Sequence, residues 1–170
     1  MDIPAVVVPY DLRWPAVFAA LRIRADGALV GIDHEIVHVG STAVPGLDAK
    51  PTIDMDVVVY AADAVGLAVE ALALAGWQPE GDLGIAGREA LEPPVDAPYH
   101  HLYVVVADSQ AHLDHIDLRD FLRTHPVQAA VYGELKHRLS GLLRTDRAAY
   151  ADGKAELVTE LLRQARAGRR

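Results

Sequence analysis

The chain has 170 residues, of which 51% are hydrophobic and 24% are charged, and it contains no cysteine. This composition predicts a folded protein with one substantial core, and it excludes disulfides, iron–sulfur ligation and a thiol nucleophile. The net charge of −8 argues against bulk electrostatic binding to DNA or RNA. No cationic stretch leads into a long apolar one at the N-terminus, and no apolar run approaches the ~18 residues of a membrane span. We therefore expect one cytoplasmic domain over residues 1–170, without membrane association.

The predicted elements of the first half alternate between helices and strands. In chain order they are a short strand or extended lead-in at 6–8, a helix at 14–29, strands at 35–39 and 52–60, a helix at 61–75 ended by Gly76, and a short strand or hairpin arm at 84–91. Asp11 lies near the start of the first helix as a possible cap.

The second half is predicted to be mainly helical. A loop through three prolines leads to a β-rich strand at 101–106. Three helices are then expected at 109–124, 126–140 and 147–167, with Pro126 in the first turn of the second.

The strand predicted at 52–60 carries two carboxylates. Asp54 and Asp56 are two residues apart, so their side chains leave the same face about 6.5–7 Å apart at the backbone. Two carboxylates on an otherwise apolar strand are costly to desolvate unless a cation or donors meet them. Hard oxygen ligands suit Mg²⁺ or Mn²⁺, so we predict Asp54 and Asp56 as metal ligands. The alternative is an edge strand whose polar face meets water.

Upstream of these carboxylates, Gly40-Ser41 ends the strand predicted at 35–39. A glycine there lets backbone amides approach phosphate oxygens, and the hydroxyls of Ser41 and Thr42 can contact phosphate or cap a helix. The order of strand, Gly-Ser, turn and a strand bearing Asp-x-Asp resembles the layout of the nucleotidyltransferase superfamily.

The segment HVGSTAVPGLDAKPTIDMD, residues 38–56, resembles more specifically the signature of the GrpB (UPF0157-like) family. The resemblance continues at Tyr10, Asp11, Trp14, His101-Leu102-Tyr103-Val104, Arg119-Asp120-Phe121-Leu122-Arg123, Pro126, Tyr132, Leu135-Lys136, Tyr150 and Gly153-Lys154. It implies an α/β (α+β) fold of the nucleotidyltransferase type, with helices packed against a mixed β-sheet and a helical C-terminal part.

The resemblance also implies a nucleotidyltransferase, which transfers a nucleotidyl group from a nucleoside triphosphate to an acceptor in a Mg²⁺-dependent reaction. Such enzymes usually supply a third carboxylate from a later strand. The strand predicted at 101–106 has no acid before Asp108, so Glu89 is the best acidic substitute. His101 is the alternative base, because the pKa of a histidine is normally near 6.5.

A second interpretation is that no transfer occurs. The chain is then a catalytically inactive module that binds a nucleotide or another phosphorylated metabolite and assists a partner enzyme. Family members also occur fused to dephospho-CoA kinase, which makes that enzyme a candidate partner by association. Nothing in the sequence names a protein partner, the preferred nucleotide or the acceptor.

Basic side chains are predicted to bind phosphate. Lys50 precedes the carboxylate-bearing strand, and Arg88 could grip a phosphate with two hydrogen bonds. Arg119 and Arg123 share a helix face at four-residue spacing. Lys136 belongs to the same helical half, residues 109–170, which is basic because it holds 11 Lys/Arg against 8 Asp/Glu. The alternative for each is a surface ion pair.

Several histidines allow a third, weaker interpretation. His112 and His115 lie three residues apart on one helix face, and with His101 they could form a zinc site. Structural zinc usually recruits thiolates, which this chain lacks, so we favour a solvated or hydrogen-bonded pair. His38, just before Gly40, is expected to support the loop.

Overall fold

The structure, a computed structural model, describes residues 4–168. Its strands are β1 (His34–Val39), β2 (Ile53–Val59), β3 (Gln78–Gly81), β4 (Arg88–Glu92) and β5 (His100–Val106). Its helices are α1 (Trp14–Ala28), α2 (Ala64–Leu74), α3 (Gln110–Thr124), α4 (Pro126–Leu139), α5 (Leu142–Thr145) and α6 (Arg147–Ala167), with a 3₁₀ turn, η1 (Ser41–Ala43), after β1.

The five strands form one mixed sheet in the order β1-β2-β5-β4-β3. The central strands β2 and β5 are parallel, and the other neighbouring pairs are antiparallel. The register places Asp54 between Val39 of β1 and His101 of β5. The end of β1 and the beginnings of β2 and β5 therefore meet at the same end of the sheet.

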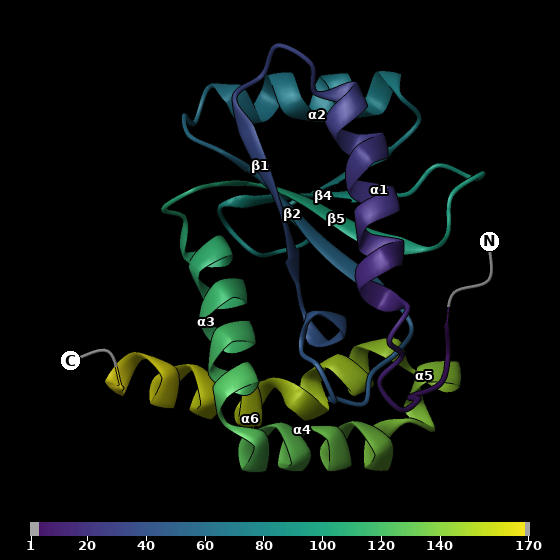
Figure 1. Cartoon of the computed structure of the whole chain (residues 1–170), viewed down its shortest axis with the longest axis vertical. Coiled ribbons are helices and arrows are strands. Elements are labelled where there is room, and N and C mark those ends of the chain that lie inside the picture. Colours follow the sequence, from purple (N-terminus) through teal and green to yellow (C-terminus); the bar gives the residue numbers. More distant parts are fainter. Residues whose placement is uncertain (1–3, 169–170) are drawn as a thin grey trace.

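The predicted packing of helices against a mixed sheet is confirmed, and helices lie on both of its faces (Figure 1). α1 and α2 pack on one face, where Met55 and Val57 of β2 are completely buried. α3 packs on the other face, where Val58 contacts a small cluster that includes Ala111. The alternation predicted for β2 is thus confirmed, and it directs Asp54 and Asp56 toward the α3 face.

The remaining helices, α4 to α6, lie beyond the end of the sheet and below it in Figure 1. A second core cluster joins α3, α4 and α6 to the loop after β1, through Val44 and Leu47. This arrangement brings the C-terminal helices over the end of the sheet that carries Gly40, Asp54 and His101. Within residues 4–168, no helix is both long enough and apolar enough to span a membrane.

Some predicted boundaries were wrong. The sequence does not predict β3, because its four residues, QPEG, show no hydrophobic alternation and include a proline, which suits an edge strand. The predicted arm at 84–91 begins only at Arg88, since Gly84 and Gly87 adopt positive φ values in the preceding turn. The short helix α5 was also missed.

The predictions at the N-terminus are met only in part. The segment predicted at 6–8 makes a single bridge, between Val8 and Ala49. Asp11 does not occupy the cap position of α1, which belongs to Arg13. Its carboxylate instead accepts a hydrogen bond from the backbone N–H of Arg13, 2.8 Å away, and so orders the turn before the helix.

Candidate functional site

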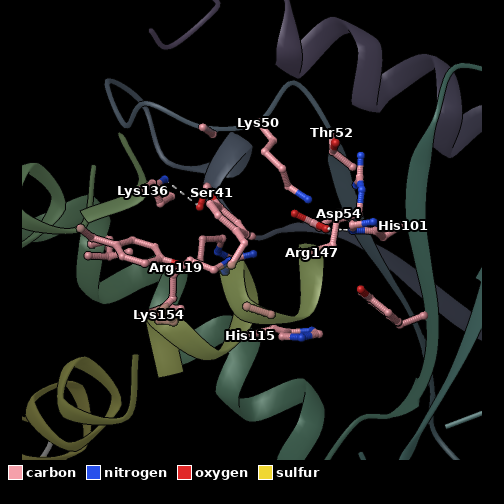
Figure 2. Close-up of a pocket in the computed structure, with 18 of the residues that line it drawn as sticks. Ser41, Lys50, Thr52, Asp54, His101, His115, Arg119, Lys136, Arg147 and Lys154 are labelled. Atoms are coloured by element: carbon pink, nitrogen blue, oxygen red, sulfur yellow. Dashed lines mark hydrogen bonds and ion pairs between the residues drawn. The ribbon is translucent and has the colours of Figure 1, made fainter. Parts of the chain in front are cut away.

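A cavity of about 420 Å³ lies between the sheet end and the C-terminal helices. Its walls carry six cationic side chains, which come from four different elements and one loop: Lys50, Arg88, Arg119, Lys136, Arg147 and Lys154. Asp54 is the one carboxylate among the described residues that line it. Figure 2 shows Lys50 extending toward Asp54 from one side, with Lys136 and Lys154 further along the wall. Such an excess of positive charge in a concave site favours an anionic ligand.

Asp54 is held by a neighbouring histidine. His101 Nδ1 donates to Asp54 Oδ1 at 2.6 Å, and His101 Nε2 lies 3.2 Å from the hydroxyl of Tyr99. Burial alone would raise the pKa of Asp54, but the hydrogen bond from His101 and the charge of Lys50 together lower it. The carboxylate is therefore ionised and retains partial exposure to the cavity, with a quarter of its side-chain surface accessible.

Asp56 has a different environment, although it lies on the same strand face. Its side chain is completely buried, and it accepts hydrogen bonds from His112 Nδ1 at 2.8 Å and from His115 Nδ1 at 2.9 Å. Asp56 does not line the cavity, so the two carboxylates do not meet there as the sequence predicts. The two histidines form a hydrogen-bonded pair around Asp56, the arrangement favoured over a zinc site.

The loop after β1 is built around Gly40 and η1. Gly40 has a φ of 70°, and a Cβ at this position would lie 2.2 Å from Asp54 Oδ2. Only glycine lets the carboxylate of Asp54 lie against the backbone here. Ser41 follows and faces the cavity, where its Oγ accepts a hydrogen bond from Lys136 Nζ at 3.1 Å.

The other predicted residues of this region support the loop, and one of them also lines the cavity. Thr42 Oγ1 donates to the carbonyl of Thr52 and contacts His38 Nε2 at 3.0 Å, which confirms the supporting role expected of His38. Arg123 Nε donates to the carbonyl of Ala43. Arg119 both lines the cavity and donates to the carbonyl of His38.

Two tyrosine–lysine pairs form the helical wall of the cavity. Tyr132 and Lys136 are four residues apart on α4, and Tyr150 and Lys154 have the same spacing on α6, so each pair shares a helix face. Lys136 Nζ lies 4.6 Å from the Tyr132 ring, and Lys154 Nζ lies 4.4 Å from the Tyr150 ring. These ring contacts hold the two amino groups in place.

The lysines of this wall carry perturbed pKa values. Burial, followed by repulsion from Lys154, lowers the pKa of Lys136 to about 7. Burial, followed by repulsion from Lys50, lowers the pKa of Lys154 to about 8. Burial also lowers the pKa of Lys50, against the opposing effect of Asp54.

A buried hydroxyl also faces the cavity. Thr52 is 3% exposed, and its Oγ1 has no hydrogen-bond partner among residues 4–168. A buried polar group without a partner is costly, so this hydroxyl is a candidate contact for a ligand.

The structure brings most of the predicted phosphate-binding residues together: Gly40, Ser41, Lys50, Arg88, Arg119 and Lys136. Glu89 is not among the lining residues, because Arg88 faces the cavity and its neighbour on the strand points to the opposite side. Three further polar residues line the cavity without having been predicted as site residues: Thr52, Arg147 and Lys154. Only Lys154 had a usable signal, the repeated Tyr-x-x-x-Lys spacing.

The protein supplies few metal ligands at this site. Residues 4–168 contain no group of three or more His, Asp or Glu side chains placed to hold a metal ion. Mg²⁺, however, is often bound by one carboxylate together with water and the phosphates of the substrate. Asp54, ionised and partly exposed in the cavity, fits that mode, whereas a site using both Asp54 and Asp56 does not fit the described arrangement.

Comparisons with known proteins agree with this fold. A family model described as GrpB protein matches residues 4–164. A UPF0157 protein of Pseudomonas aeruginosa is 37% identical over 171 residues, which cover 96% of this chain and 69% of that protein. The UPF0157 protein YqkA of Bacillus subtilis is 31% identical over 152 residues, which cover 89% of this chain and 44% of that protein.

Solved structures show the same architecture. The conserved protein GrpB from Enterococcus faecalis superposes with a TM-score of 0.81 at 28% identity, covering 94% of this chain and 96% of that one. The Cid1 poly(U) polymerase, in a structure with MgGTP bound, superposes with a TM-score of 0.58 at 15% identity, covering 84% of this chain and 46% of that one. The second likeness shows that the fold is of the nucleotidyltransferase type.

Proposed function

The chain belongs to the GrpB family, and we propose that it binds a phosphorylated small molecule of the nucleotide class without transferring a nucleotidyl group. The observation that carries this proposal is the cavity itself, which has six cationic side chains and one carboxylate on its walls. A concave site with this imbalance selects a ligand with several negative charges.

The roles proposed for the side chains follow from their positions. Lys136 and Lys154 project from the helical wall and Lys50 from the opposite side, so the three surround a phosphate chain. Arg88 is available for a bidentate contact, because a guanidinium matches two phosphate oxygens. The guanidinium of Arg119 already donates to Asp120 and to the carbonyl of His38, so its proposed contribution is positive charge. Gly40 and Ser41 supply the close backbone approach and a hydroxyl.

A divalent cation is part of this proposal. Asp54 would hold Mg²⁺ or Mn²⁺ through its carboxylate, and His101 would keep that carboxylate ionised and oriented. When bound, the ion would neutralise phosphate charge and fix the geometry of the phosphate chain.

The described geometry supports binding better than catalysis. Nucleotidyl transfer needs a base for the acceptor, and both ring nitrogens of His101 already have partners, Asp54 and Tyr99. Glu89 faces away from the cavity, and Asp56 is enclosed by its histidines. Nucleotidyl transfer is therefore the alternative function, and an assay for pyrophosphate release must exclude it.

We expect ATP or another nucleoside triphosphate to bind more tightly with Mg²⁺ than with a chelator. Asp54→Asn should remove this Mg²⁺ enhancement, with a loss of about tenfold or more in affinity, because it removes the anionic metal ligand. Isothermal titration calorimetry measures both effects. Asp96→Asn, on the exposed ion pair with Arg24 outside the cavity, is the matched control.

Pyrophosphate release distinguishes the two functions. With Mg²⁺, a nucleoside triphosphate and a panel of hydroxyl, amine and phosphate acceptors, the proposal expects binding without release. Release that depends on Asp54 would establish transfer instead. Absence of binding by any nucleotide or phosphorylated metabolite would contradict the proposal altogether.

Anion affinity should fall as the pH rises through the range of the two lysine pKa values. Lys136 and Lys154, with pKa values of about 7 and about 8, lose their charges in that range. Sulfate is a suitable probe, because its own charge is constant across the range. We expect a decrease of up to about tenfold for each ammonium lost.

Arginine stays charged at every accessible pH, so Lys136→Arg and Lys154→Arg provide the control. Each should flatten part of the pH profile of sulfate binding, measured by calorimetry. A profile that is unchanged in both variants would assign the pH dependence to other groups.

A further inference from the structure

The distribution of lysine in this chain is unusual. Of its 16 lysine and arginine residues, only three are lysines, namely Lys50, Lys136 and Lys154, and all three line the same cavity. Arginine supplies the cations elsewhere and also contributes to the cavity. A lysine differs from arginine in a property that matters here, since burial can remove its proton and leave a nucleophilic amine.

Lys136 has the surroundings that favour a neutral amine. It is 2% exposed, and among residues 4–168 no carboxylate forms an ion pair with it. Its Nζ contacts the hydroxyl of Ser41 at 3.1 Å and the ring of Tyr132 at 4.6 Å, and Lys154 lies close enough to repel its charge. A buried ammonium without a carboxylate partner is costly, whereas the neutral amine needs only the Ser41 hydroxyl.

We propose that Lys136 is a nucleophilic amine that forms an imine with a phosphorylated aldehyde or ketone bound in the cavity. The inference rests on the proposed function, because the side chains that bind phosphate would orient the ligand. Two of these, Lys50 and Lys154, are called the phosphate seat. Lys154, on the same helical wall, and Lys50, on the opposite side, bind its phosphate and leave the carbonyl carbon facing Lys136 (Figure 2). Ser41 stands beside the amine, where its hydroxyl can pass a proton to the carbonyl oxygen.

The step is balanced without an oxidant or a reductant. The nitrogen lone pair of Lys136 forms a bond to the carbonyl carbon, and the π pair of the carbonyl moves onto oxygen. The two amine hydrogens leave with that oxygen as one molecule of water, and a carbon–nitrogen double bond remains. Hydrolysis reverses the step and restores the free lysine.

Because the chain contains only three lysines, the test gives a clear result. The protein is incubated with pyridoxal 5′-phosphate, the imine is reduced with borohydride, and the labelled residue is identified by peptide mass mapping. We expect label at Lys136 in about threefold excess over Lys154 near pH 7.5, because only a neutral amine attacks and the pKa values of the two lysines are about 7 and about 8. Inorganic phosphate or ATP should protect it.

The control variants test whether the label depends on the Lys136 amine. Lys136→Arg keeps the charge and should abolish the specific label, whereas Asp96→Asn, outside the cavity, keeps the Lys136 amine and should retain it. Circular dichroism and thermal melting establish that both variants are folded. If Lys136→Arg does not fold, the site of labelling in the wild-type chain still decides the question.

The remaining outcomes divide between the two proposals. Labelling of Lys50 or Lys154 in place of Lys136, or binding of pyridoxal 5′-phosphate without a reducible adduct, would overturn the role of Lys136 and leave the phosphate seat standing. If no phosphorylated compound binds, the proposed function fails. Unphosphorylated pyridoxal then decides the reactivity of Lys136, since label at this residue supports the inference and its absence overturns it.

Discussion

Replacing Gly40 by alanine is expected to destabilise the protein by about 3 kcal/mol or more and to abolish ligand binding. The residue has a φ of 70°, a conformation that is unfavourable for side chains with a Cβ. The new methyl group would also lie 2.2 Å from Asp54 Oδ2, so the carboxylate would have to move away from its contact with His101. Urea denaturation measures the first effect, and calorimetry with a nucleoside triphosphate and Mg²⁺ measures the second.

Gly46→Ala is the matched control for this experiment. Gly46 also has a positive φ, 81°, but no heavy atom lies within 4 Å of the position that a Cβ would take. Its replacement should cost only the backbone strain, about 1–2 kcal/mol, and should preserve ligand binding. Equal effects of the two substitutions would show that the contact between Gly40 and Asp54 has no special importance.

The first half of the site could be predicted because its signals are local. Gly40, Ser41, Lys50 and Asp54 lie within 15 residues, and the alternation of β2 fixes which way Asp54 faces. The parallel pairing of β2 with β5 then places His101 beside it, which follows once the family resemblance supplies the sheet order. Local spacing and one strand pairing therefore account for this end of the cavity.

The rest of the site depends on contacts that the sequence does not specify. Asp56 and Asp54 look equivalent on the strand, and only the docking of α3 across the sheet encloses one and leaves the other partly open. Arg88 and Glu89 are likewise adjacent, and a shift of one residue in the start of β4 exchanges the side chain that faces the cavity. Lys154 reaches the cavity only because α6 folds back over the sheet end.

Asp56→Asn is expected to lower the free energy of unfolding by about 3 kcal/mol while leaving nucleotide affinity nearly unchanged. The carboxylate is completely buried, and it accepts hydrogen bonds from both His112 and His115. An amide offers only one acceptor oxygen and no charge, so one imidazole loses its partner. Asp54→Asn should do the reverse, with a small loss of stability and a large loss of Mg²⁺-dependent binding, because its carboxylate is partly solvated.

The stability difference between the wild-type chain and Asp56→Asn should also depend on pH. Burial alone would lower the pKa of His115, but its hydrogen bond to Asp56 and the negative charge there raise it overall. A group whose pKa is raised by folding stabilises the folded state fully below its unfolded pKa, near 6.5 for histidine, and this contribution is lost as the pH rises through the folded value. Urea denaturation at about pH 6 and about pH 9 should therefore show a larger difference at the lower pH. A difference independent of pH, or a loss of nucleotide binding in Asp56→Asn comparable to that in Asp54→Asn, would contradict the structural role of Asp56 and restore it as a candidate metal ligand.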